Sequence, residues 1–130
     1  MNTTAFFFLR LPIALSLLGH GLVRIPKLQG FSNWMVGFME KSYLPKVMIV
    51  PFSYVIPFVE VAAGLLLLIG LFTQQSIYVS LLLMALLIFG STTIENWEAI
   101  PSQLIHAIYL IILLFFIDFN SISIDNFLKK

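Results

Sequence analysis

Four ionisable side chains interrupt otherwise apolar segments and are the residues best suited to chemistry: His20, Arg24, Glu60 and His106. A lone carboxylate in a low-dielectric medium takes up a proton, whereas one beside an arginine or a protonated imidazole stays ionised. Pairing Glu60 with His20 or Arg24 therefore costs much less than burying either side chain alone. Such a cluster could bind a small polar-headed or quinone-like ligand or relay protons, or it could only fix the register of packed helices.

Helical spacing predicts that these groups lie at a similar depth. His20 comes about eight residues before the expected end of a first helix, about 12 Å along its axis. Glu60 comes about nine residues after Pro51, about 14 Å into an antiparallel second helix. Arg24 and His106 are expected about one turn nearer the same face. The sequence thus predicts a shared intramembrane site in one half of the molecule.

Several other chemistries are excluded or disfavoured. The chain has no cysteine, so it cannot itself perform disulfide exchange or thiolate catalysis, or hold a cysteine-ligated metal or cluster. Its net charge of +1 provides no basic field for a nucleic acid. The two histidines could ligate a b-type haem if they faced each other across it, but nothing in their spacing demands this. No metal site is predicted.

Arg10 is expected near the opposite face of the membrane, in a structural role. Its charge would either reach the lipid headgroups along its flexible stem or pair with a carboxylate of the C-terminal tail. Asp118 and Asp125 are the candidate carboxylates.

The elements that position these residues follow from composition. The 130 residues are 60% hydrophobic and 10% charged, with a mean hydropathy of +1.02. A soluble domain of this length could not bury so much apolar surface, so the solvent must be lipid. Apolar stretches predict spans at about 5–28, 48–72, 76–94 and 101–117. We expect one all-α domain over residues 1–130, an antiparallel four-helix membrane bundle.

The N-terminal stretch is interpreted as a retained helix because it lacks the basic start and small-residue cleavage site of a signal peptide. Small residues such as Gly19, Gly21 and Gly64 favour close approach of neighbouring helices.

Two connecting segments have amphipathic patterns. In the first loop, apolar side chains share one helical face and polar ones lie opposite, which predicts a short helix along the membrane surface. The apolar positions are Phe31, Trp34, Met35, Phe38 and Met39, and the polar ones are Asn33, Glu40 and Lys41. The tail, residues 118–130, could form a second surface-lying helix.

At these positions the sequence resembles the DoxX family of small bacterial membrane proteins. The matching pieces are Arg10 followed by Gly19-His20-Gly21 and Arg24, then Glu60 followed by the run at 64–73, and Ser123-Ile124-Asp125 after the last helix. The chain departs from the family pattern at Gln74, where a basic residue is usual, and at 118–120, where a glycine-rich turn is usual.

The resemblance implies a four-helix protein of the bacterial cytoplasmic membrane. Through the related DoxD subunit of a thiosulfate:quinone oxidoreductase or terminal quinol oxidase, it also implies quinone-linked redox complexes. Partners would then be lipid, other redox subunits or a second copy. Basic residues in the first loop favour placing that loop inside, whereas the family pattern favours both termini in the cytoplasm. We adopt the family's orientation.

The leading hypothesis is an accessory subunit that is not an enzyme on its own and that binds a quinone or similar lipophile in an intramembrane polar pocket beside His20, Arg24 and Glu60. Glu60 and His20 would accept or relay protons, and Arg24 would hold an anionic or carbonyl oxygen. One alternative is a non-enzymatic scaffold whose polar cluster is structural. Another is a small-solute permease, which four helices could form only as an oligomer.

Overall fold

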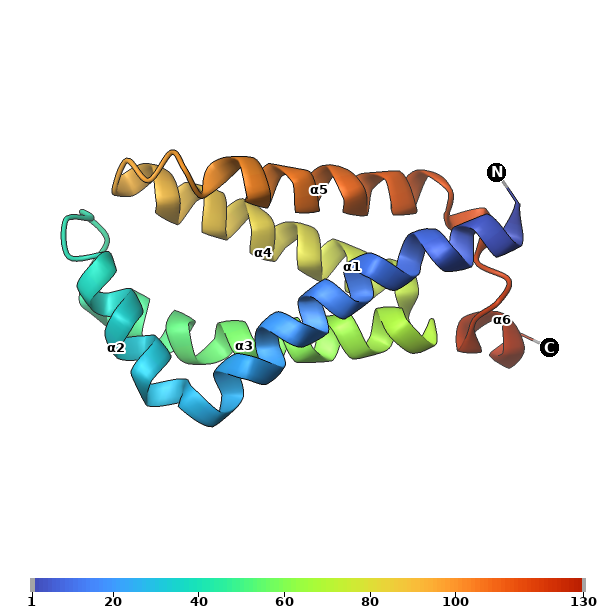
Figure 1. Ribbon diagram of the computed structural model, residues 1–130, viewed down its shortest axis with the longest axis horizontal. Helices are drawn as coiled ribbons and strands as arrows, with labels where there is room; N and C mark the ends of the chain where they lie inside the picture. The colour runs from blue at the N-terminus through green and yellow to red at the C-terminus, as the bar shows by residue number, and fades with distance from the viewer. Residues whose placement is uncertain (1, 130) are drawn as a thin grey trace.

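The computed structural model describes residues 2–129, and Met1 and Lys130 lie outside this range. Within it the chain is helical and contains no strand (Figure 1). The helices are α1 (Thr3–Arg24), α2 (Leu28–Phe38), α3 (Lys46–Ile69), α4 (Thr73–Thr93), α5 (Ile100–Phe115) and α6 (Ile124–Leu128), with short 3-10 turns at Ile25–Lys27 and Ile117–Phe119.

Three helical segments of the described chain are long and apolar enough to cross a membrane. They are the continuous run of α1 into α2, then α3, then α4. Helix α5 is equally apolar in character but has only 16 residues. The expected all-α membrane class is therefore confirmed.

Helices α1 and α3 approach closely at two glycines. A Cβ atom added at Gly64 would lie 2.4 Å from the backbone nitrogen of Leu18, and one at Gly21 would lie 2.6 Å from the carbonyl oxygen of Pro57. No atom lies within 4 Å of the corresponding position at Gly19. Close packing is thus confirmed at Gly21 and Gly64 but was wrongly expected at Gly19, which is exposed.

The first helix ends earlier than predicted. Helix α1 stops at Arg24 rather than near Leu28, and Ile25–Lys27 forms a 3-10 turn that contains Pro26. Pro26 has no N–H to continue the helical hydrogen bonds, and the backbone leaves the helical region at Lys27, with φ of −124° and ψ of 33°, so the chain bends there. Helix α2 then leaves at a steep angle to α1 (Figure 1). The hydroxyls of Ser53 on α3 and Ser32 on α2 share a 2.7 Å hydrogen bond, which fixes α2 against α3.

The α3–α4 turn is closed by the C-terminal segment. Gly70 and Phe72 adopt left-handed backbone conformations, with φ of 73° and 48°. The Asp125 carboxylate accepts hydrogen bonds from the backbone N–H groups of Phe72 and Thr73 at 2.7 and 2.8 Å. Asp125 itself donates its backbone N–H to Gly70 at 2.8 Å. Asp125 therefore caps α4 from across the fold, a function that no side chain of the turn provides.

Arg10 joins the same arrangement. Its side chain is only 2% exposed, and it donates to the Asn120 side chain and, at 3.0 Å, to the carbonyl of Ile122. We call Arg10, Asn120, Ile122 and Asp125, with the α3–α4 turn, the C-terminal clasp. Of the two roles expected for Arg10, extension to the headgroups does not occur, because amide and carbonyl oxygens of the tail bond its side chain inside the fold. The tail is correspondingly less helical than expected, with only the short α6.

Candidate functional site

Arg24 and Glu60 form an ion pair between α1 and α3. The Nη1 atom of Arg24 donates to Oε1 of Glu60 at 2.6 Å, with side-chain exposures of 30% and 5%. The guanidinium also lies over the Phe31 ring of α2, 4.7 Å from its centroid. Glu60 reaches α1 because it is on the face of α3 that carries Pro57 and Gly64, where the two backbones are closest. The pair neutralises the charge of a buried carboxylate.

His20 of α1 and His106 of α5 form a second pair. Their ring centroids are 6.1 Å apart and their planes are nearly perpendicular, at 82°. The hydroxyl of Ser16 lies 3.0 Å from Nε2 of His106 and 3.5 Å from Nδ1 of His20. Ser16 is a member of this group that sequence reasoning missed, although its position four residues before His20 was a usable signal.

Backbone contacts fix the tautomer of both imidazoles. Nδ1 of His20 lies 2.7 Å from the carbonyl oxygen of Ser16, and Nδ1 of His106 lies 2.8 Å from that of Ser102. A carbonyl oxygen only accepts, so each Nδ1 must carry the hydrogen. In the neutral ring Nε2 is then an acceptor. Haem ligation through His106 would require loss of its contact with Ser16, so the geometry does not favour it.

The structure brings the four predicted residues together as these two neighbouring pairs. Both imidazoles lie close enough to act electrostatically on the Glu60 carboxylate. The depths predicted for His20 and Glu60 were measured from the wrong helix ends, because α1 ends at Arg24 and α3 begins at Lys46. His20 is also exposed rather than enclosed, while His106 is half-buried.

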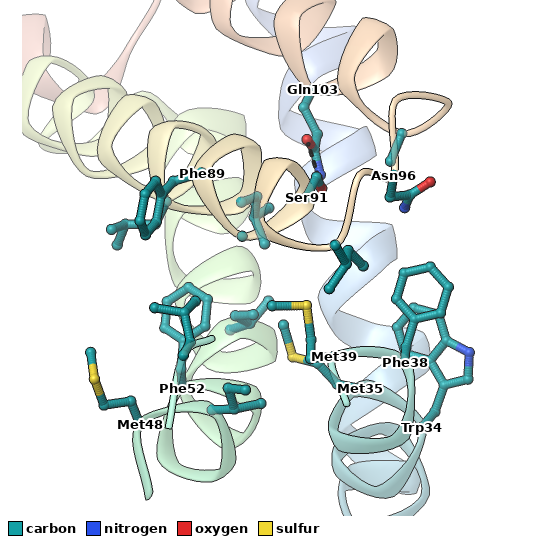
Figure 2. A pocket seen from close by; sticks show the side chains of 18 of the residues that line it. Trp34, Met35, Phe38, Met39, Met48, Phe52, Phe89, Ser91, Asn96 and Gln103 are labelled. Atoms are coloured by element: carbon teal, nitrogen blue, oxygen red, sulfur yellow. Dashed lines mark hydrogen bonds between the residues drawn. The ribbon is translucent and has the colours of Figure 1, made fainter. Parts of the chain in front are cut away.

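A cavity of about 470 Å³ lies beside the ion pair, among mostly apolar side chains and not within the polar cluster from which a ligand pocket was predicted (Figure 2). Helices α2, α3 and α4 and the start of α5 contribute its walls, which are mostly aromatic, aliphatic and methionine side chains. Prominent among them are Phe31, Trp34, Met35, Met39, Phe52 and Phe89. The amphipathic face of residues 31–39 was its signal in the sequence. Part of that face lines this cavity instead of lying against lipid alone.

The cavity has few polar groups, and these are Arg24, Ser91, Asn96 and Gln103. Figure 2 shows the Gln103 amide pointing towards Ser91, with which it makes long contacts of 3.3 and 3.4 Å. Arg24 is the one predicted site residue that lines the cavity. It follows His20 by one turn on α1, and Gln103 precedes His106 by one turn on α5. Neither histidine lines the cavity, but each is thus one turn from a residue that does.

An all-helical fold with membrane-length apolar helices, an ion pair between two of them and an apolar cavity defines a small multi-pass membrane protein. Residues 3–102 match the family described as methylamine utilisation protein MauE, and the chain belongs to this family. The matched region contains His20, Arg24 and Glu60 but ends before His106. No curated protein and no solved structure matches the chain. The expected DoxX resemblance is thus met only at the coarser level of a small membrane-protein family.

Proposed function

We propose that the chain is an accessory protein of a membrane redox system, such as one for methylamine utilisation, and that it binds a quinone-like lipid. The tail of the ligand occupies the apolar cavity and its headgroup oxygen accepts a hydrogen bond from Arg24. One observation carries the proposal: Arg24 lines the cavity and is held in place by Glu60.

The dimensions and chemistry of the cavity support a lipophilic ligand. A volume of about 470 Å³ falls within the range of small-molecule sites, which are mostly apolar with a few well-placed polar groups. A guanidinium has five N–H donors, and the described residues provide one partner, Glu60. The other donors are free to hold a ligand oxygen. Since Glu60 already balances the positive charge, a neutral carbonyl headgroup suits the site better than an anion.

Contacts between helices support a fourth span and an antiparallel bundle. The Tyr109 hydroxyl donates to the carbonyl of Leu9 at 2.6 Å, while His106 meets Ser16. Later residues of α5 thus contact earlier residues of α1, as antiparallel helices do. The C-terminal clasp then returns the chain end to the start of α1, and Figure 1 places both termini at the same end. We place these ends in the cytoplasm and the protein in the inner membrane.

Quinone binding by the purified protein in lipid nanodiscs tests the function. Wild type should retain native quinone through purification and bind added decylubiquinone saturably. Arg24→Gln should weaken this binding by at least tenfold, whereas Lys27→Gln, an exposed cation outside the cavity, should not. Gly90→Phe supplies an independent variant, because Gly90 lines the cavity and a side chain there would fill it while leaving the ion pair intact.

The scaffold hypothesis predicts a different result. If the polar cluster is only structural, wild type binds no quinone, and Arg24→Gln changes only the melting temperature. Either the absence of saturable binding, or unchanged binding in stable Arg24→Gln and Gly90→Phe proteins, would overturn the proposed function.

A further inference from the structure

Within the described chain, His20 has an unused hydrogen-bond acceptor one helical turn from the donors of Arg24. His20 and Arg24 lie one helical turn apart on the same face of α1. Nδ1 of His20 is engaged with the Ser16 carbonyl at 2.7 Å. Among the described residues, no group donates to its Nε2. His20 is exposed and does not itself line the cavity, but it lies one turn from Arg24, which does.

His106 is in a different state. Its Nε2 lies 3.0 Å from the Ser16 hydroxyl, whose single hydrogen satisfies it. The donor-seeking atom of the group is therefore Nε2 of His20, and a second acceptor becomes available only if Ser16 turns away from His106.

A carbonyl oxygen can accept from Arg24 but has nothing to donate to His20. A phenolic hydroxyl does both, because its oxygen accepts a hydrogen bond and its hydrogen is donated. We propose that His20 makes the site selective for the hydroquinone form of the ligand over the quinone form. This inference rests on the proposed function and adds to it the redox state of the bound lipid.

The test compares equilibrium binding of decylubiquinol and decylubiquinone to the full chain in nanodiscs of one synthetic lipid, without oxygen. Wild type should bind the quinol about three- to tenfold more tightly, the effect of one added hydrogen bond. His20→Leu should lose this preference by weakening quinol binding while leaving quinone binding unchanged. Ser102→Ala is the matched control, since its exposed side chain is on α5 and only its backbone carbonyl contacts His106.

Ser16→Ala provides a second variant with an effect in the opposite direction. Removal of the hydroxyl frees Nε2 of His106, so the quinol preference should be kept or increased. A merely structural role of the group would instead lower both affinities together.

The two proposals fail in different ways. If wild type binds neither form, the proposed function is overturned. If wild type binds both forms equally, or His20→Leu keeps the wild-type ratio, the quinone site stands and the selectivity inference is overturned.

Discussion

Arg24 contacts three kinds of surroundings at once, a carboxylate, an aromatic ring and an apolar cavity. Its position at the last residue of α1 explains this, because the bend that follows brings α2 over it. The charge of Arg24 and that of Glu60 are each tolerable in a membrane because the other is present. The strength of this dependence can be measured.

Removing one partner of the ion pair should destabilise the protein more than removing both. We expect Arg24→Leu, or Glu60→Leu, to lower the free energy of unfolding by about 2.5–3.5 kcal/mol, the cost of one uncompensated charge within a span. The double variant should recover more than half of the loss. Denaturant unfolding in detergent, arranged as a double-mutant cycle, measures this coupling. Additive losses would show that the two charges are not stabilised by each other.

Asp125 predicts a dependence of stability on pH. Burial acts to raise the pKa of its carboxyl, but hydrogen bonds from Thr73 and Phe72 outweigh this, and the pKa lies below its ordinary value of 3.8. The unfolded chain then binds the proton more readily than the folded one. The ionised carboxylate therefore stabilises the fold fully above about pH 4, and this contribution is lost as pH falls through the folded-state pKa.

Asp125→Asn should accordingly lower stability at pH 7 by about 0.5–2 kcal/mol, the range for loss of a helix cap. The difference from wild type should shrink on acidification, because wild type loses the same contribution. Melting temperatures between pH 3 and 7 measure it. Asp118→Asn, at an exposed position of the same tail, serves as control and should follow wild type. A constant difference between Asp125→Asn and wild type over the whole range would contradict this account.

The residues with charge could be identified from the sequence, but their neutral partners could not. An arginine and a glutamate within apolar runs are conspicuous because each needs a partner. Ser16, Asn120 and the carbonyl of Ile122 contribute through distance and direction, which depend on how α1, α5 and the tail pack. The C-terminal clasp is an example. Arg10 bonds the Ile122 carbonyl of the tail, and Asp125 caps α4 instead of forming an ion pair with Arg10.

At the scale of elements, glycine decides which helices meet. Gly21 and Gly64 let α1 and α3 come into backbone contact, and Glu60 reaches Arg24 because of that approach. The sequence marks glycines but not which of them face a neighbour. The end of α1 could have been predicted, because Pro26 has no N–H to donate within a helix that continues to Leu28.

Glycine-to-alanine substitutions test this contact. Gly64→Ala and Gly21→Ala should each destabilise the protein by about 1–3 kcal/mol, because a Cβ atom would collide with backbone that cannot move aside. Gly19→Ala, on the same helix and with open space around it, should be neutral or stabilising by up to about 1 kcal/mol through helix propensity. Unfolding in detergent compares the three, and equal effects would show that helix propensity, not contact, decides them.

At the scale of the whole molecule, the cavity is the feature furthest from sequence reasoning. It is formed where α2 folds back beside α3 and α4, and no single segment contains it (Figure 2). The apolar pattern of residues 31–39 was interpreted as a surface that meets lipid, because an amphipathic helix has the same pattern in both situations. Only the bend after Arg24 determines that much of this face turns inward.

The number of crossings is the last property that the fold predicts. If α5 spans the bilayer, the N-terminus, the α3–α4 turn and the C-terminal tail lie on one side, and the loops after α2 and α4 lie on the other. The chain has no cysteine, so single cysteines can be introduced without altering any native thiol. Asn2, Gln74 and Lys129 represent the first side, and Lys41 and Glu98 the second.

Labelling of these five variants with a membrane-impermeant maleimide, in intact and in permeabilised cells, measures the topology. Cysteines at Lys41 and Glu98 should react in intact cells, and those at Asn2, Gln74 and Lys129 only after permeabilisation, if both termini are cytoplasmic. The opposite pattern would keep four spans and reverse the orientation. If Lys129→Cys is labelled under the same conditions as Glu98→Cys, and Gln74→Cys is not, α5 does not cross the membrane. That result would also contradict the clasp, because Asp125 caps α4 beside Gln74.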